Sequence, residues 1–192
     1  MSKVAIKGAA TGTGVFTLES PATNTDRTLV LPDEAGTVLT SASSIVQNTG
    51  AVFKAYTSAN QSIPHNTLTK VLCGVTLYNE GNFWDTATSK FTPNTSGYYQ
   101  INASGRLSSN TNQYLQIFVR KNGNPLLSQM LVIVGNGSGE IQVSICDVVY
   151  LNGTTDYLEL YAYQYDYTST GARNLFSGAS DTFISGHLIR TA

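Results

Sequence analysis

The stretch that decides the fold spans residues 79–107 and reads NEGNFWDTATSKFTPNTSGYYQINASGRL. Turn-forming residues alternate in it with short apolar pieces. Pro93, which cannot donate a hydrogen bond to a central ladder, precedes another turn at residues 94–97. From Tyr98 onward apolar and polar residues alternate, which is the period of a half-buried strand. The stretch therefore predicts tight turns that lead into one long strand.

The same kind of pattern continues from residue 51 to the end of the chain. Strand-like runs are separated by turns at sandwich-like spacing, and no 3.6-residue apolar period accompanies them. Asn122-Gly123 between two apolar runs is a strong hairpin signal, because both residues of such a turn need positive φ. We expect about eight strands, and the fold class is all-β. The runs are residues 52–56, 68–78, 98–107, 113–120, 126–134, 140–151, 157–167 and 181–190.

The spacing within residues 79–107 also resembles a known family. It is similar to the signature of the globular heads of complement and of the tumour-necrosis-factor-like trimers. Two later segments extend the resemblance to about residues 51–190. In 140–151, Cys146 stands where the family has Gly before an acid, and in 181–189, Ser185 is inserted before the Gly of the closing strand. The residues that carry the first match are Asn79, Gly81, Phe83, Asp85, Thr88, Phe91, Pro93, Gly97 and Tyr98 or Tyr99.

The resemblance implies a ten-stranded jelly-roll β-sandwich that packs as a tight homotrimer with a stalk at one end. Such heads bind receptors, glycans or other proteins on outer loops and do no chemistry. The receptor-binding residues are not part of the shared pattern, so none is assigned. The fold-signature residues that the resemblance implies for the core are Phe83, Phe91, Gly97, Tyr99, Phe183 and Gly186. The candidate rim loops are residues 57–67, 108–112, 135–139 and 168–180.

Residues 1–48 differ from the rest of the chain. Their β-prone pieces are each too short to close a core in one chain, and RTLVLPDEAGTVLTSAS resembles linker modules of bacteriophage tail fibres and tailspikes. The alternative is a disordered tail. We therefore expect a short β-rich stalk or virion-attachment segment at residues 1–48 and a head at residues 49–192. The Ser/Thr/Gly-rich residues 40–50 read as a hinge between them.

The composition excludes several classes of protein. Charged residues make up 12% of the chain, against about 25% in typical soluble domains, and the net charge is −1. No basic cluster is longer than Arg120-Lys121, so nucleic-acid binding is not expected. No apolar run approaches the roughly 20 residues of a membrane span, and no secretory signal is visible. These features fit a protein made in a bacterial cytoplasm and located on a virion.

Two cysteines, Cys73 and Cys146, lie in strand-like runs without C-x-x-C spacing. We expect both to be buried free thiols rather than a disulfide.

One strand is unusually rich in tyrosine. Side chains alternate along a strand, so its tyrosines share one face and Leu158, Leu160 and Ala162 share the other. Tyrosine combines a large apolar ring with a polar tip, and we interpret this face as the subunit contact of a trimer. A carbohydrate-stacking surface and an ordinary inner face of the sandwich are the alternatives. The interface tyrosines are Tyr157, Tyr161, Tyr163 and Tyr165, with Tyr167 at the next odd position.

No set of residues indicates catalysis, and we expect no enzyme. His65 and His187 lack a partner acid and are read as surface or packing residues. Four acids could form the carboxylate pair of a glycosidase, but solvated strand ends explain them better. They are Asp147, Asp156, Glu159 and Asp166. No cofactor is expected, because phosphate-loop and EF-hand patterns are absent; a structural calcium ion is compatible with the Asp and Asn turns but is not predicted.

These observations together predict a homotrimeric phage virion fibre protein whose head binds a host-surface receptor, a glycan or a protein, during adsorption. Residues 1–48 would contact other virion proteins, while no nucleic acid or membrane insertion is involved. The alternatives are a capsid decoration or head-fibre protein without receptor binding, and a bacterial surface adhesin.

Overall fold

The structure, a computed structural model, describes residues 22, 24–26, 28, 51–109, 112–133 and 139–192. The chain divides into two units, Met1–Ala42 and Ser43–Ala192. The predicted attachment segment, residues 1–48, lies outside the described residues apart from positions 22, 24–26 and 28. The architecture below is that of the second unit.

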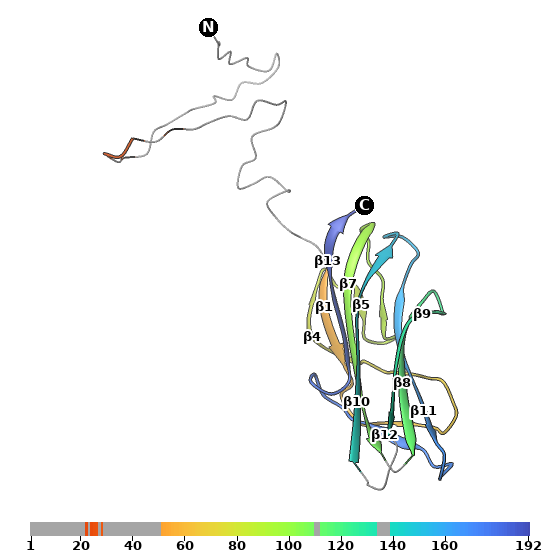
Figure 1. The fold of residues 1–192 in the computed structure, drawn as a ribbon. Coiled ribbons are helices and arrows are strands. Elements are labelled where there is room, and N and C mark those ends of the chain that lie inside the picture. Colours follow the sequence, from red (N-terminus) through yellow and green to blue (C-terminus); the bar gives the residue numbers. More distant parts are fainter. Residues whose placement is uncertain (1–21, 23, 27, 29–50, 110–111, 134–138) are drawn as a thin grey trace. The chain divides into compact units, whose positions relative to one another are not determined.

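The described part of the second unit is a sandwich of two antiparallel sheets (Figure 1). In sheet A the order is β4 (Val75–Glu80), β1 (Val52–Tyr56), β13 (Phe183–Thr191), β7 (Gly97–Ser109) and β10 (Gly139–Leu151). Beyond β13, the same edge of β7 pairs with β12 (Arg173–Leu175), which pairs with β2 (Gln61–Ile63). In sheet B the order is β9 (Asn124–Ile133), β8 (Gln113–Lys121), β11 (Leu158–Asp166), β6 (Lys90–Phe91) and β5 (Trp84–Asp85). The short β3 (Thr69–Lys70) also pairs with β11.

The core lies between the two sheets, and the predicted alternation accounts for it. On β7, Tyr99, Ile101 and Ala103 point inward, and β8 and β11 contribute their alternate aliphatic residues from the other sheet. Burying each large aliphatic or aromatic side chain contributes about 1.5–3 kcal/mol. The expected all-β sandwich is therefore confirmed. The inward aliphatic residues of β8 and β11 are Leu115, Ile117, Val119, Leu158, Leu160 and Ala162.

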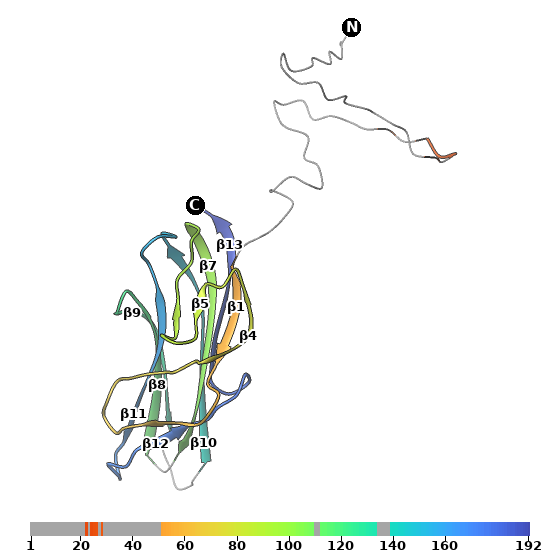
Figure 2. The ribbon, with the colours of Figure 1, turned by 180° about the vertical axis from the view of Figure 1, so that it is seen from behind.

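The strand expected at residues 68–78 is wrong as a single element. The chain there forms β3, passes through residues 71–74, and then begins β4. In Figure 2 the gold-coloured chain between β1 and β4 crosses between the sheets. Its β2 pairs with β12 of sheet A, and its β3 pairs with β11 of sheet B. Val71 and Cys73 are buried during the crossing, which explains why the run looks apolar although it is not one strand.

The signature stretch forms the turn and short hairpin that seal one side of the core. Gly81 has φ of 82°, and a Cβ there would lie 2.2 Å from the Phe83 ring, so only glycine fits. Phe91 stacks on Phe53 with ring centroids 4.3 Å apart and meets Tyr99 edge-on at 5.5 Å. Aromatic pairs of this kind add about 0.5–1.5 kcal/mol beyond their burial. The signature thus joins β1 of sheet A to the hairpin of sheet B.

Most residues that the resemblance placed in the core lie there. Phe91, Gly97, Tyr99 and Gly186 are buried, and Phe83 packs partly buried against the core. Phe183 differs. It is half-buried on the outward face of sheet A, with the Lys54 ammonium 4.1 Å from its ring centroid, because the next residue of β13, Ile184, takes the inward position.

Both cysteines are free, as expected. Cys73 is buried, but Cys146 is exposed, so the burial expected for Cys146 is wrong. The reason is that β10 pairs only with β7 at the margin of sheet A, and Ile145 takes the inward position beside it. Cys146 therefore projects from the outward face.

Candidate functional site

The two ends of the sandwich differ in the chain segments that they carry. At one end the last residues of β13 pair with the start of β7, and the amide of Leu188 donates to the carbonyl of Ala51 at 3.0 Å. Ala51, where the described part of the second unit begins, therefore lies at the end that carries the C-terminus (Figure 1). The opposite end, hereafter the distal end, is where β7 ends and β8 begins, and where β9 ends and β10 begins.

Three connections that follow strands ending at the distal end contain no charged residue. The connections there read NTN at residues 110–112, VGNGS at 134–138 and YTSTGA at 167–172. Of the predicted rim loops, 57–67 contains β2 and 168–180 contains β12, whereas 108–112 begins inside β7. The loop 135–139 lies outside the described residues except for Gly139. These connections contain hydroxyl, amide and aromatic residues, and Arg106 forms ion pairs with Glu140 and Asp181 beside this end.

A group of aromatic rings lies on the outward face of sheet B next to the distal end. Tyr114 of β8 and Tyr165 of β11 are register partners with ring centroids 5.8 Å apart, and Tyr163 also lies 5.8 Å from Tyr114. Tyr167 packs edge-on against Tyr165 at 4.9 Å, and the His65 ring lies 4.6 Å from Tyr165. We call these five side chains the tyrosine cluster.

Hydrogen bonds connect the hydroxyls of Tyr114 and Tyr163. Tyr163 Oη donates to Asn66 Oδ1. Burial and a hydrogen bond with Tyr163 raise the pKa of Tyr114 to about 12. These bonds fix the orientation of the Tyr114 and Tyr163 side chains relative to Asn66.

The other two predicted interface tyrosines lie at the opposite end of the same strand region. The Lys90 ammonium lies 4.1 Å from the ring centroid of Tyr157, and the guanidinium of Arg120 lies 5.0 Å from that of Tyr161. The predicted alternation is present: the tyrosines from Tyr157 to Tyr165 are half-buried on the outward face. The structure brings Tyr163 and Tyr165 into the cluster and leaves Tyr157 and Tyr161 under cations.

A buried ion pair supports the cluster from beneath. Asp166 lies 2.5 Å from the Arg173 guanidinium and accepts hydrogen bonds from the backbone amide and hydroxyl of Thr168. Burial alone would raise the pKa of Asp166, but the bonds from Thr168 and Arg173 outweigh it and lower the pKa to about 2. The backbone amide of Asp166 donates to His65 Nδ1 at 3.4 Å. His65 is thus a packing residue between this turn and Tyr165.

The remaining candidate acids are also held in place. Glu159 is buried and lies 2.7 Å from Lys70, and Asp156 lies 2.7 Å from Lys121. Asp147 is exposed on β10 and accepts a hydrogen bond from the amide of Val148. Asp156, Glu159 and Asp166 each have their own cation, which is the arrangement of structural ion pairs.

A second group of apolar side chains is exposed on the outward face of sheet A, near the C-terminal end. Tyr98 and Tyr150 face each other across β7 and β10 with ring centroids 5.6 Å apart. A hollow of about 370 Å³ is lined by Tyr98, Val148, Ile189 and Arg190. We call Tyr98, Val148, Tyr150 and Ile189 the sheet A patch.

The edge strand β9 of sheet B also exposes apolar side chains. Met130, Leu131 and Val132 are consecutive and all exposed, so both faces of the strand present apolar side chains. Leu126, nearer the start of β9, is exposed as well. Sequence reasoning missed the sheet A patch and this edge, although the run LLSQMLVIV is a signal for an apolar strand that needs cover.

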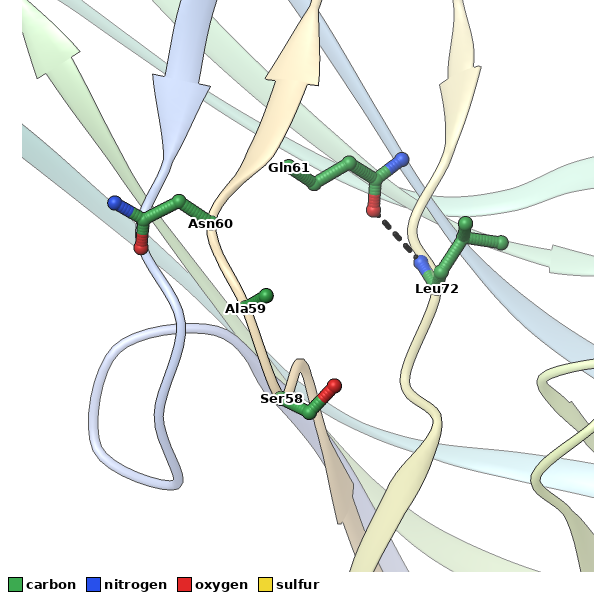
Figure 3. Close-up of a pocket in the computed structure, with 5 residues that line it drawn as sticks. All are labelled: Ser58, Ala59, Asn60, Gln61 and Leu72. Atoms are coloured by element: carbon green, nitrogen blue, oxygen red, sulfur yellow. Dashed lines mark hydrogen bonds between the residues drawn. The ribbon is translucent and has the colours of Figure 1, made fainter.

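A smaller pocket of about 200 Å³ lies between the segment at the start of β2 and the one that precedes β4 (Figure 3). Gln61 spans it: its Oε1 accepts from the amide of Leu72 at 2.9 Å, and its Nε2 donates to the carbonyl of Lys70 at 2.7 Å. Asn60 Oδ1 accepts from the amide of Ser177. These amides join neighbouring segments, so the pocket is a structural joint.

Among the residues that the structure describes, no three His, Cys, Asp or Glu side chains are grouped to hold a metal ion. The described part of the chain also contains no helix long and apolar enough to cross a membrane.

The sandwich is similar to solved structures of complement and tumour-necrosis-factor type. The globular domain of zebrafish complement 1qA matches with a TM-score of 0.54 and 16% identity, over 74% of this chain and 99% of that one. Eiger TNF from S. frugiperda matches at 0.51 and 14%, over 74% and 93%. Murine APRIL at pH 5.0 matches at 0.54 and 13%, over 73% and 99%.

No protein-family model matches the sequence, and no curated protein sequence matches it. The likeness to the solved structures therefore concerns the fold: the head is a jelly roll of the complement and tumour-necrosis-factor type.

Proposed function

We propose that this chain is a homotrimeric fibre protein of a bacteriophage virion, attached through residues 1–48, whose head binds a host-surface glycan or protein during adsorption. The observation that carries the proposal is the polarity of the head. β7, β9 and β11 end at the side opposite to Ala51, and the connections that follow them contain no charged residue in the sequence. A head attached at one end presents the other to its surroundings, and rigid sandwiches with outer loops suit recognition.

The trimer is supported by exposed apolar surface on sheet A. The sheet A patch and the edge strand β9 belong to neighbouring sides of the sandwich, and both leave large apolar side chains in water. Exposed groups of large apolar side chains mark interaction sites. A side that packs onto the face of the next copy forms a head-to-tail contact, which closes into a ring when the rotation fits. We therefore place the subunit contact on sheet A and β9 instead of on the tyrosine strand.

The two cysteines provide a direct test of this contact. Cys146 lies on the outward face of sheet A, while Cys73 is buried in each chain. In a trimer that covers sheet A, Cys146 is protected by the contact and Cys73 by its burial within the chain. A maleimide reagent should therefore label the native full chain slowly. After dissociation in mild denaturant, it should label one thiol per chain. Sedimentation should give about three times 20.6 kDa. A 20.6 kDa species with a rapidly labelled Cys146 would refute the trimer.

Recognition at the distal end is supported by its chemistry. Hydroxyl, amide and tyrosine side chains form hydrogen bonds to neutral ligands without a desolvation cost for charge. Three copies on one fibre also raise the overall avidity of weak single-site contacts by factors of about 10²–10⁴.

The test is adsorption. The labelled full chain should bind a subset of bacterial strains and should block adsorption of the virus that encodes it. Immunogold labelling should place it at the tail. Labelling of the capsid surface without cell binding would favour a decoration protein, and its presence on bacteria without a virus would favour an adhesin; either result would overturn the proposal.

A further inference from the structure

We infer that the tyrosine cluster on the outward face of sheet B is a binding site for an uncharged carbohydrate chain. The inference deepens the proposed function, because it names the ligand class and the residues that the head would use. The cluster comprises Tyr114, Tyr163, Tyr165, Tyr167 and His65.

The rings supply the apolar part of such a site. Aromatic faces carry negative potential, which attracts the weakly positive C–H groups of a pyranose ring. Tyr167 is 66% exposed, which is unusual for so large a side chain, and it sits beside the half-buried Tyr165. A ring left in water next to fixed rings is the arrangement that a flat, partly apolar ligand covers.

The polar part of the site surrounds the rings. Asn66 accepts from the Tyr163 hydroxyl, and Gln116 is the cross-strand partner of Tyr163 on β8. The connection that follows Tyr167 adds the hydroxyls of Thr168, Ser169 and Thr170. Side-chain amides and hydroxyls both donate and accept, as the hydroxyl groups of a sugar do.

The charged residues near the tyrosine cluster favour a neutral ligand. Arg173 is paired with Asp166 below the cluster, and Arg120 lies over Tyr161 toward the other end of β11. An acidic glycan or nucleic acid needs cations near its charges. Within the described residues, both of these cations contact internal partners, and the connection at residues 167–172 beside the cluster contains no charged residue.

The cluster is also ordered before binding. The ring contacts join β8, β11 and the loop after β2, and the Asp166 ion pair holds the turn that carries Tyr167. Side chains that are already fixed lose little entropy when a ligand binds. A second copy of the chain has another surface to contact, because large apolar side chains are exposed on the sheet A patch and on β9, away from the cluster.

The test uses the full-length protein labelled with ¹³C on tyrosine. Its probes are glucose hexamers with α-1,4 and β-1,4 links, a mannose hexamer, and a galacturonate hexamer as the acidic contrast. At least one neutral hexamer should shift the aromatic signals of the cluster at millimolar concentration, and galacturonate should not. Absence of any shift with the neutral hexamers, or a response only to galacturonate, would overturn the inference.

Variants then assign the site. Tyr165→Ser and Tyr167→Ser should each weaken hexamer binding at least tenfold, while Tyr165→Phe, which keeps the ring, should stay within threefold of the wild type. Tyr157→Ser, at the other end of the same face, is the matched control and should bind normally. Equal loss in Tyr157→Ser, or a smaller sedimenting mass of Tyr165→Ser, would show a structural or subunit role instead.

Cell binding separates this inference from the proposed function. If the wild-type chain binds cells and Tyr167→Ser binds them equally well, the head recognises its receptor elsewhere and the inference fails alone. If the wild-type chain binds no strain while the hexamers still shift the tyrosine signals, the proposed function fails and the carbohydrate site remains.

Discussion

The side-chain amide of Asn79 forms two hydrogen bonds with the backbone of Trp84. Asn79 Oδ1 accepts from the amide of Trp84 and Asn79 Nδ2 donates to its carbonyl, each at 3.0 Å. The indole of Trp84 donates in turn to the carbonyl of Cys73 at 3.0 Å. One side chain thus closes the turn that the signature stretch begins, and it fixes the tryptophan that covers the core.

Replacing Asn79 tests the contribution of these two hydrogen bonds to stability. Asn79→Ala removes two partly buried hydrogen bonds and leaves the Trp84 groups without them, so the free energy of unfolding should fall by about 2 kcal/mol. Urea unfolding followed by Trp84 fluorescence measures the change. Asn94→Ala, at an exposed turn where the side chain only accepts from Thr95, is the control and should change stability by less than about 0.5 kcal/mol. Equal losses of stability in the two variants would show that the hydrogen bonds of Asn79 to Trp84 do not stabilise the fold.

The Asp166–Arg173 pair predicts a specific response to acid. The pKa of Asp166 is about 2 in the folded chain and 3.8 in its ordinary state, so its stabilising contribution is complete above about pH 4 and is lost as the pH falls toward 2. Arg173→Met leaves a buried carboxylate without its cation and should cost about 3 kcal/mol at pH 7. The difference from the wild type should shrink as the pH falls toward 2, because the buried carboxyl of the variant becomes neutral at a higher pH than that of the wild type.

The matched control for that variant is Lys90→Met. Lys90 lies 3.8 Å from Glu159, which keeps Lys70 at 2.7 Å, so the loss of stability should be small. A difference for Arg173→Met that stays constant from pH 7 to pH 2 would exclude the buried pair as its cause.

Tyr114 predicts a response to alkali of the opposite sign. Its pKa is raised to about 12 by burial and by the hydrogen bond with Tyr163, against 10 for an ordinary tyrosine. Its contribution is therefore complete below about pH 10 and lost as the pH rises toward 12. Tyr114→Phe should make the fall of the unfolding free energy between pH 10 and pH 12 shallower. The change in slope should correspond to a difference of less than one bound proton. Tyr163→Phe should shift the same titration toward lower pH. Unchanged slopes in both variants, measured by urea unfolding, would contradict this assignment.

Two sets of substitutions decide which sheet forms the subunit contact. Val148→Glu places a charge in the sheet A patch, where a partner would have to bury it, and should reduce the sedimenting mass from about three times 20.6 kDa to 20.6 kDa at micromolar concentration. Tyr161→Ser combined with Tyr163→Ser tests the tyrosine strand and should leave the mass unchanged. The reverse pattern would return the interface to the tyrosine strand.

Local pattern was sufficient to predict the fold class and most of the long strands. The period-2 alternation placed Leu158, Leu160 and Ala162 inside and the tyrosines outside, and both were found there. The same reasoning failed at Cys146 and at the run 68–78, because an apolar run looks alike whether it is an edge strand with one open face or a buried crossing between sheets. Which of these a run becomes depends on partners far away in the sequence.

The sequence by itself determined the sandwich and which side chains share a face of each strand, because alternation is set by the backbone of a single strand. Only the tertiary structure decided what lies opposite each face. Tyr98, Val148 and Ile189 are at least 41 positions apart in the sequence, and they meet around one hollow only because β7 pairs with β10 on one side and β13 on the other. Such pairings are long-range, so the proposed contact surfaces were visible only in the tertiary structure.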